Sequence, residues 1–239
     1  MFGLGTIINT AAIILGGIFG GLFGKLLKVR HQDGLQKACG ISVLFLGTAG
    51  ALEGMLTVSG GKLLSGQGLL ITLSLALGAL IGELCNIEGG FERFGTWLKQ
   101  KTGNSKDARF VEGFVTASLT VCIGAMAIVG AIEDGLTGDF SVLLTKAILD
   151  FIIIIVMTCS LGRGCAFSAI PVFLLQGSVT ALAVLIKPLM TAAALANLSM
   201  VGNILIFCVG VNLVWGKKIR VANMLPAIIL AAAAAFLPI

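Results

Sequence analysis

Long apolar segments alternate with short polar segments over the whole chain. Each apolar segment holds about 20 residues, the length that an α-helix needs to cross the hydrocarbon core of a bilayer. The pattern therefore predicts an all-α, polytopic transmembrane helix bundle of about eight spans, forming a single domain over residues 1–239. The predicted spans are residues 3–24, 38–58, 67–87, 112–132, 142–162, 168–187, 191–215 and 221–239. Whether the sixth and seventh spans are complete is open, because only Lys187-Pro188 separates them.

The composition and the placement of charge agree with a membrane-embedded chain. The sequence is 57% hydrophobic and 11% charged, whereas a soluble domain carries about 25% charged residues. Most of the 16 Lys and Arg residues lie in the loops after spans one, three, five and seven. Basic loops stay on the cytoplasmic side, so the N-terminus is expected outside. Because these residues are scattered through short loops, the net charge of +5 indicates the lipid bilayer and not nucleic acid as partner.

The segment 88–111 is the longest and most polar loop and is predicted to be cytoplasmic. Residues 91–99 form the pattern of a short amphipathic helix, with aromatic side chains on one face and charged ones on the other. Such a helix lies in the membrane interface. Anchoring is the favoured role, and a regulatory or partner-binding role is the alternative.

An internal two-span repeat is predicted from similar motifs in the first four spans. Gly50-Ala51-Leu52-Glu53 ends span two, and Gly130-Ala131-Ile132-Glu133 ends span four. The repeat-like hairpins cover about 3–58 and 67–135, followed by the remaining spans in 142–239. Transporters commonly place their substrate site where repeats meet. Glu53 and Glu133 are therefore expected at the outer mouth of a pathway, or alternatively as two acids in head-group water.

Glycines recur at every fourth position in spans one and three. Small residues at this spacing let helix backbones approach closely in lipid. We expect tight helix packing or a homo-oligomer seam, with a substrate track along bare backbone as the alternative. The residues are Gly16, Gly20, Gly24, Gly78 and Gly82.

A carboxylate, Asp150, lies near the middle of span five, one helical turn after Lys146. An ionisable group at that depth costs about 2.5–3.5 kcal/mol on insertion scales and usually faces a bundle interior or a wet cavity. Asn9, Gln176 and Asn203 lie at depths from which they could help to line such a cavity. The alternative is a structural role, with Asp150 either protonated or paired with Lys146 at the i, i+4 spacing.

The segment 159–171 contains a lone Arg163 between Gly162 and Gly164, where span five ends. It is either a re-entrant turn whose free amides meet an anion or, the favoured interpretation, an ordinary tight loop with a topogenic arginine.

The six cysteines contain no Cys-x-x-Cys pair, and the single histidine, His31, lies in a loop. We therefore expect no metal, no cofactor and no disulfide framework.

The sequence resembles the YqgA/YdfK-type bacterial inner-membrane proteins, a family built on a domain of unknown function. The resemblance covers essentially the whole chain and is carried by Gly3-Leu4-Gly5-Thr6-Ile7-Ile8-Asn9-Thr10-Ala11-Ala12-Ile13-Ile14-Leu15-Gly16-Gly17 and by the two Gly-Ala-apolar-Glu motifs. It implies a multi-pass protein of the bacterial cytoplasmic membrane, with transport as the expected role. It brings no substrate and no catalytic residues.

These observations favour a secondary transporter or channel for a small polar solute or ion. Asp150 would be its proton or cation site, with Lys146 beside it. An intramembrane enzyme is not expected, because the sequence offers neither a metal cluster nor a second acid at the depth of Asp150. The remaining alternative is a non-transporting membrane scaffold or accessory subunit.

Overall fold

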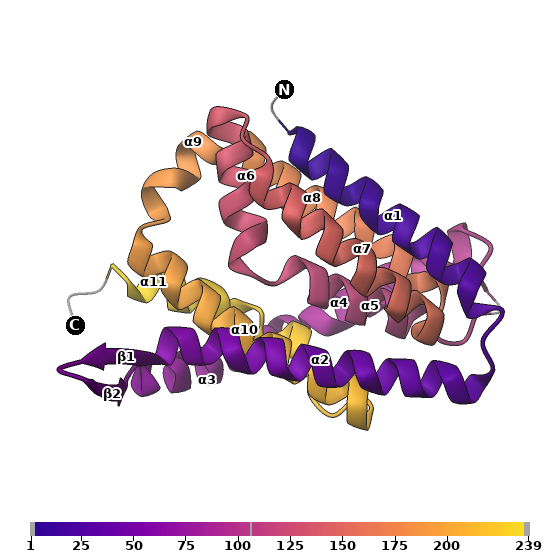
Figure 1. Cartoon of the computed structure of the whole chain (residues 1–239), viewed down its shortest axis with the longest axis horizontal. Helices are drawn as coiled ribbons and strands as arrows, with labels where there is room; N and C mark the ends of the chain where they lie inside the picture. Colours follow the sequence, from indigo (N-terminus) through magenta and orange to yellow (C-terminus); the bar gives the residue numbers. More distant parts are fainter. Residues whose placement is uncertain (1–2, 106, 237–239) are drawn as a thin grey trace.

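The computed structural model describes residues 3–105 and 107–236, and most of these residues are helical (Figure 1). The first half of the chain consists of α1 (Leu4–Gly24), α2 (Val29–Met55), β1 (Leu56–Ser59), β2 (Lys62–Ser65), α3 (Gly68–Cys85), α4 (Ile87–Lys101) and α5 (Phe110–Cys122). The second half consists of α6 (Ala125–Thr137), α7 (Ser141–Leu161), η1 (Arg163–Ser168), α8 (Ala169–Ala181), α9 (Ala183–Ile186), η2 (Lys187–Leu189), α10 (Ala192–Trp215), η3 (Val221–Met224) and α11 (Pro226–Ala234).

The helices support a polytopic membrane bundle. Among the described residues, six helical segments are long and apolar enough to cross a membrane: α1, α2, α3, α7, η1–α8 and α10. The count becomes seven if α5 and α6 together form one bent span. The eighth predicted segment corresponds to a shorter apolar helix, Val221–Ala234.

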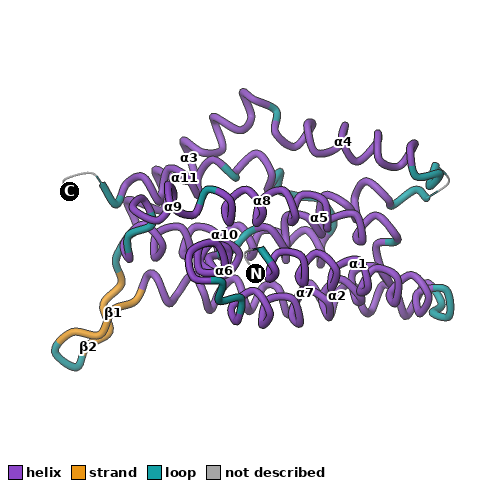
Figure 2. The backbone as a smooth tube through the Cα atoms, turned by 90° about the horizontal axis from the view of Figure 1, so that it is seen from above, coloured by secondary structure: helices purple, strands orange, loops and turns teal. Residues whose placement is uncertain are grey.

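Two local features differ from the predicted boundaries. Helix α2 begins at Val29, well before the predicted start at residue 38, because helical hydrogen bonding continues through a polar turn that includes the Asp33–Lys37 ion pair. After α2, the chain forms an antiparallel hairpin in which Thr57 is opposite Leu64. Gly60 and Gly61 form its two-residue turn with positive φ angles of 58° and 73°, as a type I′ turn requires. The hairpin projects from the bundle (Figure 2).

Helices that are far apart in the sequence lie side by side. Helix α1 packs along α7, α2 packs along α10, and α3 packs against η3 and α11 (Figures 1 and 2). The first two helices therefore belong to different parts of the bundle. Helix α7 also contacts α2 and so joins these parts.

The predicted glycine ladders lie at these close contacts. A Cβ atom added to Gly16 would be 2.8 Å from the Phe151 carbonyl oxygen, and one added to Gly20 would be 2.6 Å from that of Ile155. Gly24 meets the backbone of Cys159 in the same way, at 3.1 Å. Gly78 and Gly82 face the backbone of Ala227 and Asn223, respectively. The ladders therefore pack helices of the same chain against each other, because glycine has no side chain and lets two helix backbones approach closely.

The fourth predicted span is not one continuous helix. Helices α5 and α6 are bent by 62° relative to each other. Between them, Gly124 has φ +141°, a conformation that L side chains rarely adopt. The break leaves carbonyls at the end of α5 and amides at the start of α6 without intrahelical partners. The expectation of an unbroken span over 112–132 was therefore wrong at Gly124.

Helix α4 contains the predicted amphipathic segment and extends beyond it at both ends. Leu98 is buried, and Phe94 contacts Phe114 of α5 with ring centroids 5.8 Å apart. Trp97 on the same helix is 51% exposed and stacks on Phe94. One side of α4 is thus packed on the bundle, while Trp97 remains available to an interface.

Candidate functional site

The buried ion pair between Lys146 and Asp150 is the centre of the candidate site. Both residues lie on α7 at the i, i+4 spacing, and Lys146 Nζ is 2.9 Å from Asp150 Oδ1 and 2.8 Å from Oδ2. Their side chains are only 9% and 5% exposed. Removing two charges from water carries a large desolvation cost, which Coulomb attraction offsets only with good geometry and further hydrogen bonds.

Two amides from other helices complete the site. Asn9 of α1 donates through Nδ2 to Asp150 Oδ2 at 3.1 Å and to Gln176 Oε1 of α8 at 3.3 Å. Asn9 and Gln176 are 0% and 1% exposed. Their remaining polar atoms, Asn9 Oδ1 and Gln176 Nε2, are buried without a hydrogen-bond partner in the described part of the chain. The site therefore presents one free acceptor and one free donor next to an ion pair.

The helices on either side of the α5–α6 break both contact α7, the helix that carries Lys146 and Asp150. Helix breaks of this kind, with unpaired backbone groups, are where transporters bind ions and substrates.

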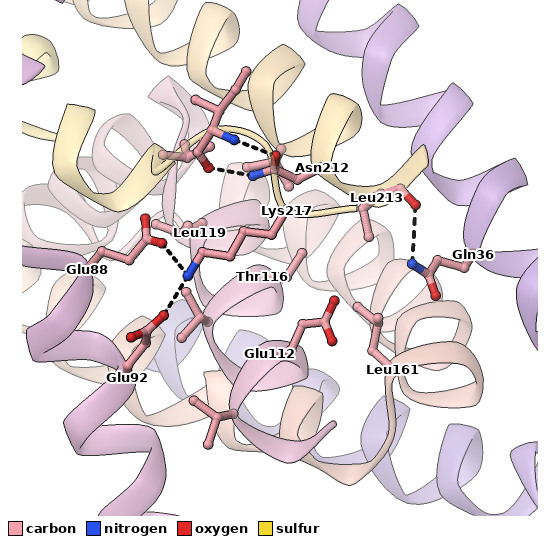
Figure 3. A pocket seen from close by; sticks show the side chains of 15 residues that line it. Gln36, Glu88, Glu92, Glu112, Thr116, Leu119, Leu161, Asn212, Leu213 and Lys217 are labelled. Atoms are coloured by element: carbon pink, nitrogen blue, oxygen red, sulfur yellow. Dashed lines mark hydrogen bonds and ion pairs between the residues drawn. The ribbon is translucent and has the colours of Figure 1, made fainter. Parts of the chain in front are cut away.

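A separate cavity of about 340 Å³ lies between α4, α5, α10 and the loop that follows α10 (Figure 3). We term it the acidic cavity, because three glutamates and one lysine are among its lining residues. Its lining includes Gln36, Glu88, Glu92, Glu112, Thr116, Leu119, Asn212 and Lys217. Thr116 and Leu119 lie on α5, whose last residue is Cys122. The cavity therefore extends along α5 in the direction of the break.

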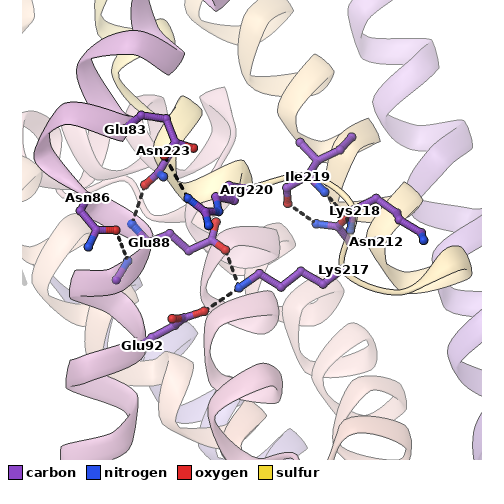
Figure 4. Close-up of polar contacts among 11 residues, drawn as sticks. Glu83, Asn86, Glu88, Glu92, Asn212, Lys217, Lys218, Ile219, Arg220 and Asn223 are labelled. Carbon is purple, nitrogen blue, oxygen red and sulfur yellow. Dashed lines mark hydrogen bonds and ion pairs between the residues drawn. The ribbon is translucent and has the colours of Figure 1, made fainter.

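Lys217 holds two carboxylates at this cavity. Its Nζ is 2.6 Å from Glu88 Oε1 and 2.5 Å from Glu92 Oε1 (Figure 4). Burial acts to lower the pKa of Lys217, but hydrogen bonds and charge from Glu88 and Glu92 outweigh it and raise the pKa above its ordinary value of 10.5. The ammonium group is thus firmly protonated at neutral pH.

Two asparagines shape the chain around Lys217. Asn212 Oδ1 accepts from the amides of Lys218 and Ile219 at 2.8 and 2.9 Å, which fixes the turn after α10 (Figure 4). Asn223 Oδ1 accepts from the Glu88 amide at 2.7 Å and so joins η3 to the start of α4. The sequence alone did not indicate these roles of Asn212 and Asn223.

The structure brings together four of the seven predicted pathway residues and separates the other three. Asn203 faces Gly50 in the α2–α10 contact and donates to the Ser199 carbonyl at 2.8 Å, so it does not join Asp150. Glu53 is exposed at the end of α2, and Glu133 is partly buried on α6. Among the described residues, neither glutamate makes an ion pair. The position of a residue along a span predicts its depth in the membrane, but it does not predict the direction that the side chain faces.

Asp134, the neighbour of Glu133, has a role that sequence reasoning missed. It is fully buried and accepts hydrogen bonds from the amides of Gly3 and Gly5 at 3.2 and 3.0 Å. A carboxylate at the start of α1 satisfies amides that lack helical partners and complements the helix dipole.

The cysteines and acids do not assemble into a metal centre in the part of the chain that the structure describes. Its six cysteines are free thiols. No group of three or more His, Cys, Asp or Glu residues in residues 3–105 and 107–236 is arranged to hold a metal ion.

Apolar helices of membrane-spanning length around a buried ion pair define a polytopic α-helical membrane protein. The family model described as "Protein of unknown function (DUF554)" matches residues 4–236, and the chain belongs to this family. It is 34% identical over 226 residues to the "Uncharacterized membrane protein YdfK" of Bacillus subtilis (strain 168), covering 95% of this chain and 93% of that one. It is 31% identical over 232 residues to the "Uncharacterized protein YqgA" of Escherichia coli (strain K12), covering 95% and 94%. The comparison with solved structures finds no significant match.

Proposed function

We propose that this protein is a secondary transporter or channel for a small polar solute or ion. The observation that carries the proposal is the meeting of Asn9, Lys146, Asp150 and Gln176, from three helices, beside the broken α5–α6 segment. Buried ionisable groups in membrane spans commonly mark solute, ion or proton routes. Asn9 Oδ1 and Gln176 Nε2 supply the free acceptor and donor that a solute or a water molecule would use.

In this proposal the structure corresponds to an occluded arrangement. The acidic cavity with Lys217 would be the entrance from one side, and the buried residues Leu119, which lines it, and Ile123 lead along the chain from the cavity to the break at Gly124. Movement of α6 relative to α5 about Gly124 would connect the entrance with Asp150. Release of Lys146 from Asp150 would then allow the carboxylate to bind a proton or a cation.

A membrane scaffold or accessory subunit is the second candidate, and a specific observation favours it. Asp150 is sealed against its own lysine, and it lines neither the acidic cavity nor four other cavities in the described residues. The unpartnered atoms of Asn9 and Gln176 and the helix break favour transport instead, because a purely structural site gains nothing from them.

We also infer a topology of eight spans in the bacterial cytoplasmic membrane, with α5–α6 as the fourth span, η3–α11 as the eighth, and the N-terminus outside. Arg109 donates to the Ser160 carbonyl at 3.1 Å, and Lys217 meets Glu88 and Glu92, so these basic loops gather at one end. The two-span repeat stays a prediction: span two is one helix, whereas its proposed copy is broken. A homo-oligomer also stays a prediction, and the glycine ladders, which pack internally, do not argue for it.

The test is solid-supported-membrane electrophysiology on proteoliposomes, with a panel of amino acids, carboxylates, inorganic ions and proton jumps. At least one solute should give a current that protein-free vesicles lack, and Asp150→Asn should abolish it. Asp33→Asn, which breaks an exposed ion pair of the same spacing, should not. Absence of current for every panel member would favour the scaffold, and equal currents from Asp150→Asn and wild type would remove Asp150 from the mechanism.

A further inference from the structure

A groove of about 640 Å³ lies between α1 and the η1–α8 segment, away from Asp150 and from the acidic cavity. Its walls are apolar, with Ile14, Ile18 and Leu22 from α1 and Phe167 and Ile170 from the other side. Ile18 and Leu22 are 52% and 57% exposed. Because α1 is long and apolar enough to span the membrane, we infer that this open face meets lipid chains.

One end of the groove carries two positive charges. Lys25 directly follows α1, and Arg163 lies between Gly162 and Gly164, just after α7 ends. Both residues are exposed, and neither makes an ion pair within the described part of the chain. Thr102 and Asn104 also line the groove and add polar groups.

One acid lies near this charged end. Asp107, with Arg109, lines an adjoining cavity that shares Lys25 and Arg163. The Asp107 carboxylate accepts a hydrogen bond from the Arg109 amide at 3.1 Å. Three basic residues against one acid leave the surroundings positive, so an anion is favoured there.

We propose that this groove binds one anionic phospholipid, with its phosphate on Lys25 and Arg163 and an acyl chain along the apolar wall of α1. Basic pockets between transmembrane helices bind anionic head groups. A free anion would leave the apolar wall uncovered, and a zwitterionic lipid would bring its own cation toward two fixed cations. The lipid site is independent of the proposed transport function.

The test is a lipid titration of the purified full chain in detergent, with bound lipid counted by native mass spectrometry. Wild type should bind phosphatidylglycerol more tightly than phosphatidylcholine. Lys25→Gln with Arg163→Gln should weaken phosphatidylglycerol binding by about twenty-five-fold, at about fivefold for each basic residue. Binding of phosphatidylcholine should be little changed.

Two matched controls separate a site from a general charge effect. Arg93→Gln with Lys218→Gln removes the same charge from exposed residues outside the groove and should keep the preference. Gly21 lines the groove with no atom within 4 Å of an added Cβ, so the side chain of Gly21→Leu should extend into the groove and occupy it. Gly177→Leu, at an equally open helix position outside the groove, should not affect lipid binding.

Three results would overturn the proposal. The first is equal binding of the two lipids by wild type. The second is an unchanged preference in the folded Lys25→Gln/Arg163→Gln protein, or in the single Lys25→Gln variant if the double variant does not fold. The third is displacement of phosphatidylglycerol by inorganic phosphate alone, which would indicate an anion site without a lipid.

Discussion

The side-chain amide of Asn9 in α1 donates a hydrogen bond to the carboxylate of Asp150 in α7 across 3.1 Å. This contact joins two spans that are 141 positions apart in the sequence. It also supplies Asp150 with a second donor besides Lys146, and a buried carboxylate needs such donors to remain ionised. The stability of the α1–α7 pair and the chemistry of the site therefore depend on the same few atoms.

Removing either charge of the buried ion pair should lower the free energy of unfolding. Removing both charges should lower it by less than the two single losses added together. Lys146→Met or Asp150→Asn alone leaves an uncompensated buried charge, for which we expect about 3–5 kcal/mol of destabilisation. The double variant removes both charges and should recover part of this loss. Unfolding equilibria in mixed detergent micelles measure all three variants.

The exposed Lys37–Asp33 pair is the control for this cycle. It has the same i, i+4 spacing, but its side chains are 55% and 60% exposed. Each single variant there should cost less than about 1 kcal/mol. Additive losses at Lys146 and Asp150 would show that the two charges do not interact in the folded protein.

Asn9 and Gln176 should differ in their importance for stability. Asn9→Leu removes hydrogen bonds to both Asp150 and Gln176 and should cost about 1.5–3 kcal/mol. Gln176→Leu removes one acceptor and also an unpartnered buried Nε2, so its cost should be below about 1 kcal/mol. The same micelle unfolding experiment ranks them, and the reverse order would contradict the hydrogen-bond arrangement described for the site.

Two neighbouring glycines in α1 should respond in opposite ways to alanine. At Gly20 a Cβ would be 2.6 Å from the Ile155 carbonyl oxygen, so Gly20→Ala should push α1 from α7 and cost about 1–3 kcal/mol. At Gly21 nothing lies within 4 Å. Gly21→Ala should therefore be neutral or stabilise by up to about 1 kcal/mol, because alanine favours the helix. Equal losses of stability in Gly20→Ala and Gly21→Ala would contradict the close contact between α1 and α7 at Gly20.

Removing Lys217 should lower the melting temperature by an amount that does not change from about pH 6 to about pH 9. A group whose pKa is raised on folding contributes stability that is fully present below its unfolded pKa and lost as the pH rises through the folded value. The folded pKa of Lys217 lies above its ordinary value of 10.5, so the ion pairs persist throughout that range.

Thermal melts of Lys217→Gln and of Lys218→Gln, its exposed neighbour, measure this effect at each pH. Lys218→Gln should be close to wild type. Because Lys217 is largely exposed, added salt should reduce the difference between the two variants. A difference that vanished below pH 9 would contradict the pairing with Glu88 and Glu92.

Hydropathy and charge predicted a helical membrane bundle with Asn9, Lys146, Asp150 and Gln176 at similar depth, and these four side chains meet in the structure. A buried charge must be solvated by whatever polar groups lie at its depth, whereas a role of these residues in a pathway stays a prediction. Asn203 does not join them, because depth does not determine which neighbour a side chain faces, and this one meets Gly50. The break at Gly124 carries a weak sequence signal, because apolar residues flank this glycine and many other glycines in the chain lie inside helices.

The pairing of α1 with α7 and of α2 with α10 also has a consequence during synthesis. The contact partner of Asn9 emerges from the ribosome 141 residues later, on the order of ten seconds at ordinary translation rates. Until then the first two helices reside in the bilayer or against the insertion machinery, with their glycine-lined faces uncovered. A truncated nascent chain ending before Ser141 should therefore remain bound to its insertase, and release should follow only when α7 has been made.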